Sequence, residues 1–315
     1  MKIALDAMGG DFAPEAIVAG AVLAANELPD DAHITLIGDQ AKIDAVLQRL
    51  GAAANSRISI VHAAEVIEMG EHPTKALAQK PDSSIAVGYR LLKSGEVSAF
   101  CSAGNTGAMM VGALFSVKAL PGVKRPPIAG FLPKINGGTG ILVDVGANAD
   151  CKPEMLEQFA EIGSIYARYV LNIAEPRVAL LNIGEEEGKG TIDVQGAYQL
   201  LKANSAVRFV GNIEGRDIFL DKCDVIVCDG FTGNVVLKMA ESIYEIMAER
   251  GISDPYFARY NYEAIGGSPI LGVNGNVVIG HGVSSPLAAC NMVKLGYQMS
   301  AAGVLERFRR VYAGG

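Results

Sequence analysis

Small polar residues and glycines that could bind an anion recur in short loops of this sequence. Residues 102–107 (SAGNTG) follow an apolar run and combine Ser102, Asn105 and Thr106 with Gly104 and a second glycine. Hydroxyl and amide donors beside unhindered backbone N–H groups are typical of a phosphate-binding loop between a strand and a helix. The alternative is a helix cap, but Asn and two glycines together exceed what a cap requires.

A lysine in a glycine-rich loop is the second candidate group. Lys189 lies between two glycines in residues 182–190 (NIGEEEGKG), where an apolar run ends. Glycine on both sides would let the ammonium move toward a substrate phosphate or a developing oxyanion. A solvated surface loop explains the same residues equally well, so both interpretations stay open.

Two further loops could supply hydrogen-bond donors and a cation. Residues 211–217 (GNIEGRD) and 229–235 (DGFTGNV) each follow another apolar run. The guanidinium of Arg216 offers a two-pronged donor for phosphate or carboxylate. We expect Asn234 to begin the helix that contains Lys238 and to keep its amide free to donate. The two residues before Asn234 join the candidate set: Thr232 and Gly233.

A glycine loop near the C-terminus contains the best-placed catalytic imidazole. His281 lies between two glycines and is followed by Ser284 and Ser285. A lone histidine is more often a structural group than a catalyst. In this loop an acid–base role and a structural role are equally open.

Two loops after predicted strands give weaker signals. The segment DVGANAD begins at Asp144 and includes Asn148. Its carboxylate could bind a divalent ion, orient a cation or cap the next helix, and we favour a positioning role because a carboxylate repels phosphate. The segment DAMGGD begins at Asp6 and includes Gly9 and Gly10, which form either an anion-approaching turn or a tight structural turn. The dinucleotide and P-loop fingerprints are both missing.

The pooled loops are rich in Gly, Asn, Ser and Lys and poor in nucleophiles. No G-x-S-x-G segment occurs, and none of the five cysteines lies beside a base that the sequence makes evident. The sequence therefore predicts a protein that binds an anion and stabilises charge without forming a covalent acyl-enzyme.

Short apolar runs alternate with segments of helical character along most of the chain. Runs such as 2–5, 33–37 and 99–101 are apolar on both faces, and helical segments such as 14–26 and 155–171 fall between them. This alternation predicts a three-layer α/β/α, Rossmann-like fold with a largely parallel sheet. In such open sheets, ligands bind beyond the carboxyl ends of the strands, where the candidate loops lie.

The chain shows no flexible linker and no internal repeat, so we expect a single domain over residues 1–315. Residues 239–250 read as an amphipathic helix, a Gly- and Pro-containing break follows at 251–255, and 256–264 resumes the pattern. This predicts a short helical hairpin near 239–265. One or two helices are expected between 287 and 312.

Composition narrows the functional class. The chain is 50% hydrophobic and 19% charged, which excludes disorder, and its net charge of −7 argues against binding nucleic acid. The five cysteines include no C-x-x-C, so neither a zinc site nor a disulfide framework is expected, and a reducing cytoplasm fits. The uncharged runs at 97–117 and 264–293 are interrupted by glycine and polar residues. We therefore read the first as strand, loop and helix rather than as a membrane span.

Taken in order, these segments closely resemble the PlsX family, the bacterial phosphate acyltransferases of phospholipid synthesis. The matching segments are DAMGGD (6–11), EHPTKAL (71–77), SAGNTGA (102–108), LPGVKRP (120–126), DVGANAD (144–150), LLNIGEEEGKG (180–190), GNIEGRD (211–217), DGFTGNVVLK (229–238), GGSPILGVNG (266–275) and HG (281–282). They extend over nearly the whole chain, and it is their order and number that separate the resemblance from chance.

The resemblance implies an acyltransferase in which inorganic phosphate attacks the thioester of a long-chain fatty acyl-carrier protein. The products would be acyl phosphate and free carrier protein. It also implies a homodimer, a fold similar to phosphate acetyltransferases and isocitrate-dehydrogenase-like enzymes, and no cofactor. A membrane glycerol-3-phosphate acyltransferase would be the downstream partner.

The resemblance also implies roles for the candidate residues. Lys189 would offset charge on phosphate or oxyanion, Asn234 would donate to the carbonyl oxygen, and His281 would protonate the departing thiolate or orient a neighbour. Phosphate near pH 7 is already substantially dianionic and needs little general-base help, so holding it and stabilising the oxyanion are the main tasks. The implied substrate- and phosphate-binding residues are Gly9, Gly10, Ser102, Gly104, Asn105, Thr106, Asp144, Asn148, Arg216, Thr232 and Gly233, with no metal ligand.

One segment departs from the family pattern. The family's helical hairpin after residue 238 is longer, with an apolar tip that touches the membrane, whereas here only residues 239–265 fill that place. Dimerisation stays plausible, but membrane docking through this tip is in doubt. A residual apolar tip could be formed by Ile252, Tyr256 and Phe257, and a basic cluster could contact anionic lipid. For each of these two groups, the alternative interpretation is an exposed helix with no membrane contact. That cluster comprises Arg307, Arg309 and Arg310.

Three other functions compete with this interpretation. A transferase of the same architecture could act on short acyl-CoA, and the length of the acyl pocket would decide. A nicotinamide-dependent decarboxylating dehydrogenase would need a metal-binding carboxylate cluster and an arginine-rich acid site, and neither is evident. The third is a non-catalytic scaffold that positions acyl-carrier protein at the membrane.

Overall fold

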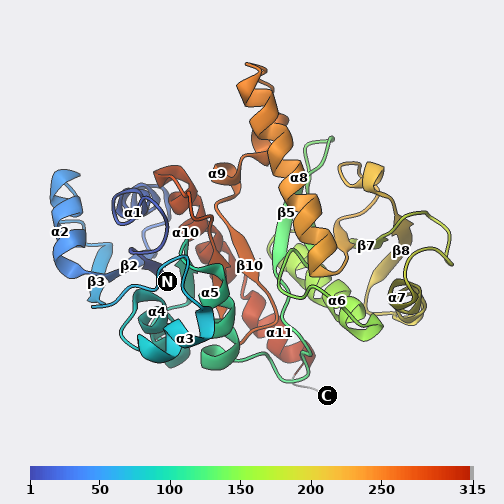
Figure 1. Cartoon of the computed structure of the whole chain (residues 1–315), viewed down its shortest axis with the longest axis horizontal. Helices are drawn as coiled ribbons and strands as arrows, with labels where there is room; N and C mark the ends of the chain where they lie inside the picture. The colour runs from blue at the N-terminus through green and yellow to red at the C-terminus, as the bar shows by residue number, and fades with distance from the viewer. Residues whose placement is uncertain (313–315) are drawn as a thin grey trace. The chain divides into compact units, whose positions relative to one another are not determined.

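The computed structural model describes residues 1–312, which form two compact units (Figure 1). Unit 1 comprises residues 1–119 and 262–305, and unit 2 comprises residues 120–261 together with the chain from residue 306 on. Each unit has its own sheet and its own helices. The sequence-based expectation of one domain over 1–315 stays a prediction.

Unit 1 is built on a six-stranded sheet in the order β10-β11-β4-β1-β2-β3. All neighbours pair in parallel except β10 and β11, which are antiparallel. Its strands are β1 (Lys2–Asp6), β2 (His33–Gly38), β3 (Ile58–His62), β4 (Ala99–Ser102), β10 (Ser268–Ile270) and β11 (Asn276–Ile279). The central strands β1 and β4 are almost entirely buried, as their unbroken apolar sequences predict.

Helices cover the unit 1 sheet. They are α1 (Glu15–Glu27), α2 (Gln40–Arg49), α3 (Pro73–Gln79), α4 (Ser84–Ser94), α5 (Thr106–Gly112), the π-helical turn η1 (Ala113–Val117), α9 (Tyr262–Ile265) and α10 (Pro286–Ala301). Helices α1 and α10 pack closely because Gly20 has no side chain: a Cβ there would lie 2.5 Å from the Cβ of Ala289. Residues 97–117 form β4, α5 and η1, which confirms the strand, loop and helix predicted there.

Unit 2 repeats the same plan on a five-stranded sheet in the order β5-β6-β9-β7-β8, with β5 antiparallel to β6 and the other pairs parallel. Its strands are β5 (Ala129–Pro133), β6 (Thr139–Val143), β7 (Arg177–Leu181), β8 (Arg208–Ile213) and β9 (Val225–Val227). Its helices are α6 (Pro153–Tyr169), α7 (Ile192–Ala203), α8 (Gly230–Glu249), the short 3-10 turns η2 (Gly215–Asp217) and η3 (Phe257–Tyr260), and most of α11 (Val304–Tyr312). The predicted α/β fold is confirmed, although its strands divide between two sheets.

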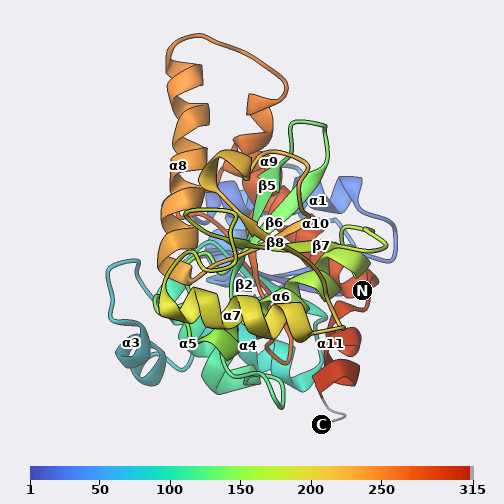
Figure 2. The ribbon, with the colours of Figure 1, turned by 90° about the vertical axis from the view of Figure 1, so that its right-hand side faces the viewer.

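The expected hairpin differs in both arms. Helix α8 starts at Gly230, before both Asn234, where we expected a helix to begin, and the amphipathic segment 239–250, and its second half extends beyond the unit 2 sheet (Figure 2). The predicted break follows at 251–255, but the return arm contains only η3 and the four-residue α9. No helix within residues 1–312 is both long and apolar enough to cross a membrane.

Candidate functional site

Two loops of unit 1 meet at the carboxyl ends of β1 and β4. The carboxylate of Asp6 is buried and accepts a hydrogen bond from Ser102 Oγ at 2.7 Å. Burial raises the pKa of Asp6, although the hydroxyls of Ser84 and Ser102 donate to it. A Cβ on Gly9 would lie 2.6 Å from the backbone nitrogen of Gly104, so these turns can touch only because position 9 is glycine.

The loop after β11 joins the same cluster. Asp11 N donates to Gly282 O at 2.7 Å, and Gly10 adopts a φ of 104°, which favours glycine. His281 is half-buried, and its ring lies 5.1 Å from that of Tyr262. The structure thus brings the three predicted unit 1 loops together around the end of one sheet.

Asn105 acts as a helix cap and as a clamp on a neighbouring loop. Its Oδ1 accepts from Ala108 N at 2.9 Å at the start of α5. Its Nδ2 donates to three backbone carbonyls, those of Glu68, Met69 and Glu71, at 3.0–3.1 Å. Asn105 is therefore a helix cap, the alternative weighed from the sequence. Its amide nitrogen is already hydrogen-bonded to residues 68–71 and holds them in position.

Thr106 is left as the outward-facing donor of this segment. It is exposed at the first position of α5, whereas the hydroxyl of Ser102 is turned inward to Asp6. Anion binding by this loop would therefore use Thr106 and backbone N–H groups of the first helical turn.

In unit 2, Asp144 organises the loop that follows β6. Its Oδ1 accepts from the backbone nitrogens of Ile128, Gly146 and Ala147 at 3.0–3.2 Å, and its Oδ2 accepts from Asn148 N and Nδ2 at 2.7 and 2.9 Å. Burial raises the pKa of Asp144 despite these donors. In the structure, the carboxylate of Asp144 holds its own loop in place, in agreement with the positioning role that we favoured over the other three. Among residues 1–312, no three His, Cys, Asp or Glu side chains are arranged to hold a metal ion.

The start of α8 corrects the expectation for Asn234. Asp229 caps this helix by accepting from Thr232 N and Thr232 Oγ1, each at 2.8 Å, so the helix begins at Gly230. Asn234 lies one turn inside, and its Nδ2 donates to Val145 O at 3.1 Å. The prediction that Asn234 begins the helix with a free amide is therefore wrong, because an aspartate earlier in the same segment is the stronger cap.

Glycines let α8 approach the Asp144 loop directly. A Cβ on Gly233 would lie 1.8 Å from Asp144 O, which no side chain can accommodate. Gly230 N donates to Asn148 O at 2.7 Å, and Asn148 Nδ2 also donates to Pro126 O at 3.1 Å. The predicted unit 2 residues of these two segments therefore form one packed group.

A pocket of about 190 Å³ opens beside this group at the carboxyl ends of β7 and β9. Apolar side chains, including Leu156, Leu180 and Val194, form much of its wall, and Asp229 and Thr232 belong to its polar side. The N-terminal turns of α6, α7 and α8 all contribute to the wall. Three helix N-termini place partial positive charge around one pocket.

Lys189 belongs to a loop that forms part of the pocket wall. The wall residues of this loop lie before and after Lys189 in the sequence. Lys189 O accepts from Asn182 Nδ2 at 3.1 Å, and the aliphatic stem of the lysine packs over Gly184. The side chain is exposed and forms no ion pair with any residue from 1 to 312. An exposed cation therefore lies in the loop beside a pocket surrounded by helix N-termini.

Other lysines pair with two of the three acids of the same loop. Lys222 pairs with Glu185 at 2.7 Å, and Lys202 pairs with Glu187 at 2.9 Å. Two of the three charges of the acidic run are therefore offset without Lys189.

Arg216 is not brought to this pocket. It lies in η2 after β8, is exposed, and pairs through Nε with Glu214 at 2.9 Å. Its guanidinium does not line the pocket.

Sequence reasoning missed the two caps that shape this pocket. Asp229 caps α8, and Thr191 caps α7 by accepting from Val194 N. Asp or Thr immediately before a helical pattern is a recognisable start signal that could have identified both. The apolar wall residues carry no such signal, since they are ordinary core side chains in sequence.

The chain is similar over almost its whole length to proteins of one family. A family model described as fatty acid synthesis protein matches residues 1–307. The phosphate acyltransferase of Heliobacterium modesticaldum is 47% identical over an alignment of 327 residues that covers 98% of this chain and 95% of that protein. The phosphate acyltransferase of Salinibacter ruber is 42% identical over 311 residues, covering 93% and 92%.

Solved structures with the same fold have more distant sequences. A phosphotransacetylase from Streptococcus pyogenes superposes with a TM-score of 0.67 at 19% identity, covering 97% of this chain and 94% of that one. The EutD phosphotransacetylase from Staphylococcus aureus gives a TM-score of 0.64 at 17% identity, covering 95% and 94%. At these identities the likeness establishes the fold, in agreement with the sequence-based prediction.

Proposed function

The chain belongs to the phosphate acyltransferase family, and we propose that it transfers a long-chain fatty acyl group from acyl-carrier protein to inorganic phosphate. The observation that carries the proposal is the pocket at the ends of β7 and β9, where three helix N-termini and the Lys189 loop surround apolar walls. An anion and an acyl thioester are the two ligands that such a pocket suits.

The reaction proposed for this site is a direct displacement. A phosphate oxygen attacks the thioester carbonyl carbon, the carbonyl oxygen becomes a tetrahedral oxyanion, and the carbon–sulfur bond then breaks. The thiolate leaves on the carrier protein and takes up a proton, so the products are acyl phosphate and carrier thiol. Lys189 and the helix N-termini offset the added negative charge. Asn234 donates one amide hydrogen to Val145 O, and we propose that its second amide hydrogen donates to the oxyanion.

The volume of the pocket limits what it can hold. At about 190 Å³ it is smaller than the roughly 300–1,000 Å³ typical of sites that enclose a whole drug-sized ligand. It therefore accommodates the thioester and the nearest part of the acyl chain rather than the entire chain.

For the unit 1 loops we propose a phosphate-binding group and a proton donor within that unit. Thr106 and the backbone N–H groups at the start of α5 bind phosphate, while Asn105 and Gly9 keep their loops in place. His281 protonates the departing thiolate. The acyl phosphate is then consumed by a membrane glycerol-3-phosphate acyltransferase, and the chain works in the cytoplasm.

A release assay tests this function. Purified protein is incubated with long-chain acyl-carrier protein at varied phosphate concentrations, and the free carrier thiol is measured. We expect thiol release that saturates with phosphate, with much lower turnover of acetyl-CoA and no absorbance change with NAD(P). Release that does not depend on phosphate would reject the reaction, and faster turnover of acetyl-CoA would favour a short-chain transferase.

A second copy of the chain is the proposed partner of α8. The exposed apolar residues Phe231, Val235, Met239 and Ile246 lie within about 80° of one helix face at roughly 100° per residue. An exposed apolar stripe on a long helix is typical of a helix–helix interface.

The stripe predicts how the dimer can be broken. Met239→Glu with Ile246→Glu should convert a dimer into monomers in sedimentation velocity at micromolar concentration, because two carboxylates would be buried in the interface. Ala248→Glu, on the opposite side of the same helix, serves as the control and should leave the dimer intact. Equal sedimentation coefficients for both variants would contradict the assignment of this face.

A further inference from the structure

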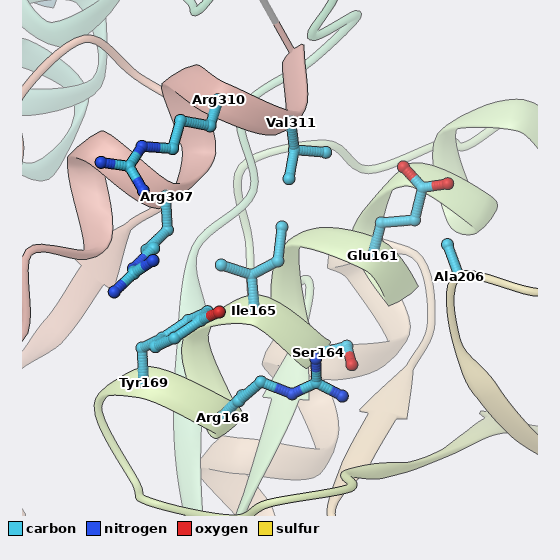
Figure 3. Close-up of a pocket in the computed structure, with 9 residues that line it drawn as sticks. All are labelled: Glu161, Ser164, Ile165, Arg168, Tyr169, Ala206, Arg307, Arg310 and Val311. Atoms are coloured by element: carbon cyan, nitrogen blue, oxygen red, sulfur yellow. The ribbon is translucent and has the colours of Figure 1, made fainter.

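A groove between α6 and α11 combines an apolar floor with a basic rim (Figure 3). It has a volume of about 300 Å³ and lies within unit 2, away from the carboxyl ends of the strands. Ile165 of α6 and Val311 of α11 face each other across it, and the ring of Tyr169 continues the floor. Arg168 lies on the α6 side, and two further arginines lie on α11.

The arginines of this groove have no acidic partner among residues 1–312. Arg168, Arg307 and Arg310 are all exposed, and none forms an ion pair with any residue in the described range. Arg307 lies over the Tyr169 ring, 4.6 Å from its centroid. Glu161, an acid that lines the groove, accepts from Tyr312 Oη and Asn204 Nδ2 instead.

This arrangement contrasts with the rest of the chain. Outside the groove, most exposed arginines of residues 1–312 pair with a carboxylate, as Arg49 does with Glu15 and Arg208 with Glu175. The whole chain carries a net charge of −7, so it repels an acidic protein except where cations gather without partners. The groove is such a place.

The rim of the groove is connected to the Asp144 loop. Gln158 of α6 donates to Gly122 O and accepts from Lys124 N, at 2.7 and 2.8 Å, so residues 122–125 lie beside α6. This segment adds two exposed cations, since Lys124 is followed by Arg125. The chain then continues to Ile128, whose N–H donates to Asp144 at 3.0 Å. Because Gln158 lies one helical turn before the groove-lining Glu161, the segment that leads to the Asp144 loop adjoins the groove.

We propose that the α6/α11 groove docks an acidic amphipathic helix of the protein that carries the acyl group, a proposal that rests on the function proposed above. One apolar side chain of that helix enters between Ile165 and Val311, and its carboxylates pair with Arg168, Arg307 and Arg310. Two helices already form the walls of the groove, which suits a third helix laid along it. Complementary charge would also raise the rate of encounter.

A lipid surface fits the groove less well. Membrane-binding helices present bulky apolar residues outward, whereas Phe308 of α11 is only 3% exposed and Val311 is the one outward apolar residue of its last turn. The apolar part of the site is a concave floor, and a concave floor receives a side chain rather than inserting into a bilayer.

Charge reversal tests the proposal. The variant Arg307→Glu/Arg310→Glu is compared with Arg90→Glu/Arg208→Glu, which changes the net charge equally at other exposed arginines. The dissociation constant for acyl-carrier protein is measured by calorimetric titration, and turnover is measured with both acyl-carrier protein and neutral acyl-pantetheine. We expect the groove variant to bind the carrier at least about tenfold more weakly and to turn over acyl-pantetheine at the wild-type rate. The control should bind the carrier within about twofold of wild type.

The outcomes separate docking from catalysis. Equal carrier affinity in the two double variants would overturn the docking proposal. It would also be overturned if the groove variant bound phosphatidylglycerol vesicles more weakly while its affinity for the carrier stayed equal to that of the control. If the wild type showed no phosphate-dependent turnover of either thioester, the proposed function would be rejected instead. The comparison of carrier affinities would still test the docking proposal in that case. Arg310→Gln removes a single exposed charge and provides a milder variant. It should weaken carrier binding by about two- to fourfold, and unchanged binding would count against the groove.

Discussion

Replacing Lys189 by alanine is expected to lower phosphate-dependent turnover by about 10²–10³-fold, the usual cost of removing one group that stabilises a developing oxyanion. The side chain is exposed and has no ion-pair partner in the described chain, so its loss should leave the unfolding temperature unchanged. Steady-state kinetics with varied phosphate would show whether the effect falls on kcat, as expected for charge stabilisation in the transition state, or on the KM for phosphate.

Two variants control this experiment. Lys189→Arg keeps the charge and should recover part of the lost activity. Lys93→Ala removes an exposed lysine in the last turn of α4 and should stay within about twofold of wild type. Wild-type turnover by Lys189→Ala would establish the other interpretation of this loop, that of a solvated surface segment.

Replacing Lys134 by methionine is expected to reduce the free energy of unfolding by about 1.5–3 kcal/mol, because it removes one of the two cations that bond the buried carboxylate of Asp224. Lys134 is 5% exposed, and its ammonium contacts Asp224 at 2.5 Å and Asp221 at 2.9 Å. Arg177 bonds the same two carboxylates from β7. Urea denaturation at pH 7 measures the loss.

The pH dependence identifies the cause of that loss. Burial by itself would raise the pKa of Asp224, but hydrogen bonds from Arg177 and Lys134 outweigh it and lower the pKa from 3.8 to about 2. A lowered pKa stabilises the folded state fully above about pH 4 and loses this contribution as pH falls toward 2. The difference between wild type and Lys134→Met should therefore be constant from pH 5 to 7 and shrink below about pH 4.

An exposed pair provides the matched control. Lys42 lies 3.9 Å from Asp39 with both side chains well exposed, so Lys42→Met should cost less than about 1 kcal/mol. A loss in Lys134→Met no larger than in this control would contradict the role given to the buried network.

Calorimetry of the same proteins tests the single-domain prediction. One unfolding transition is expected, and two transitions would contradict the prediction.

The predicted elements that agreed best with the structure have strong local signals. The runs at 2–5 and 33–37 became β1 and β2, and the segments 14–26 and 155–171 became α1 and α6 within a few residues. Their apolar spacing determines which side can be buried, and that information lies within the segment itself. The start of α8 was placed too late because the apolar pattern was followed and the Asp229 cap was overlooked.

The candidate loops were found for the same local reason, since glycine and small polar residues punctuate the ends of strands. What each side chain does there was not predictable from spacing. The amide of Asn105 donates to carbonyls 34–37 residues away in sequence, and the amide of Asn234 donates to a carbonyl 89 residues away. Such partners exist only once the strands have been ordered into sheets.

The sequence by itself determined the element types, the positions of the loops and, through the resemblance over nearly the whole chain, the family. The tertiary structure decided how the strands divide between two sheets, which donors are already used, and where unpaired charge remains. Lys134 meets Asp224 across 90 residues of sequence, and three arginines from α6 and α11 gather around one groove. The physical reason is that burial and charge pairing depend on the neighbours that distant segments supply, whereas helix and strand periodicity is a property of adjacent residues.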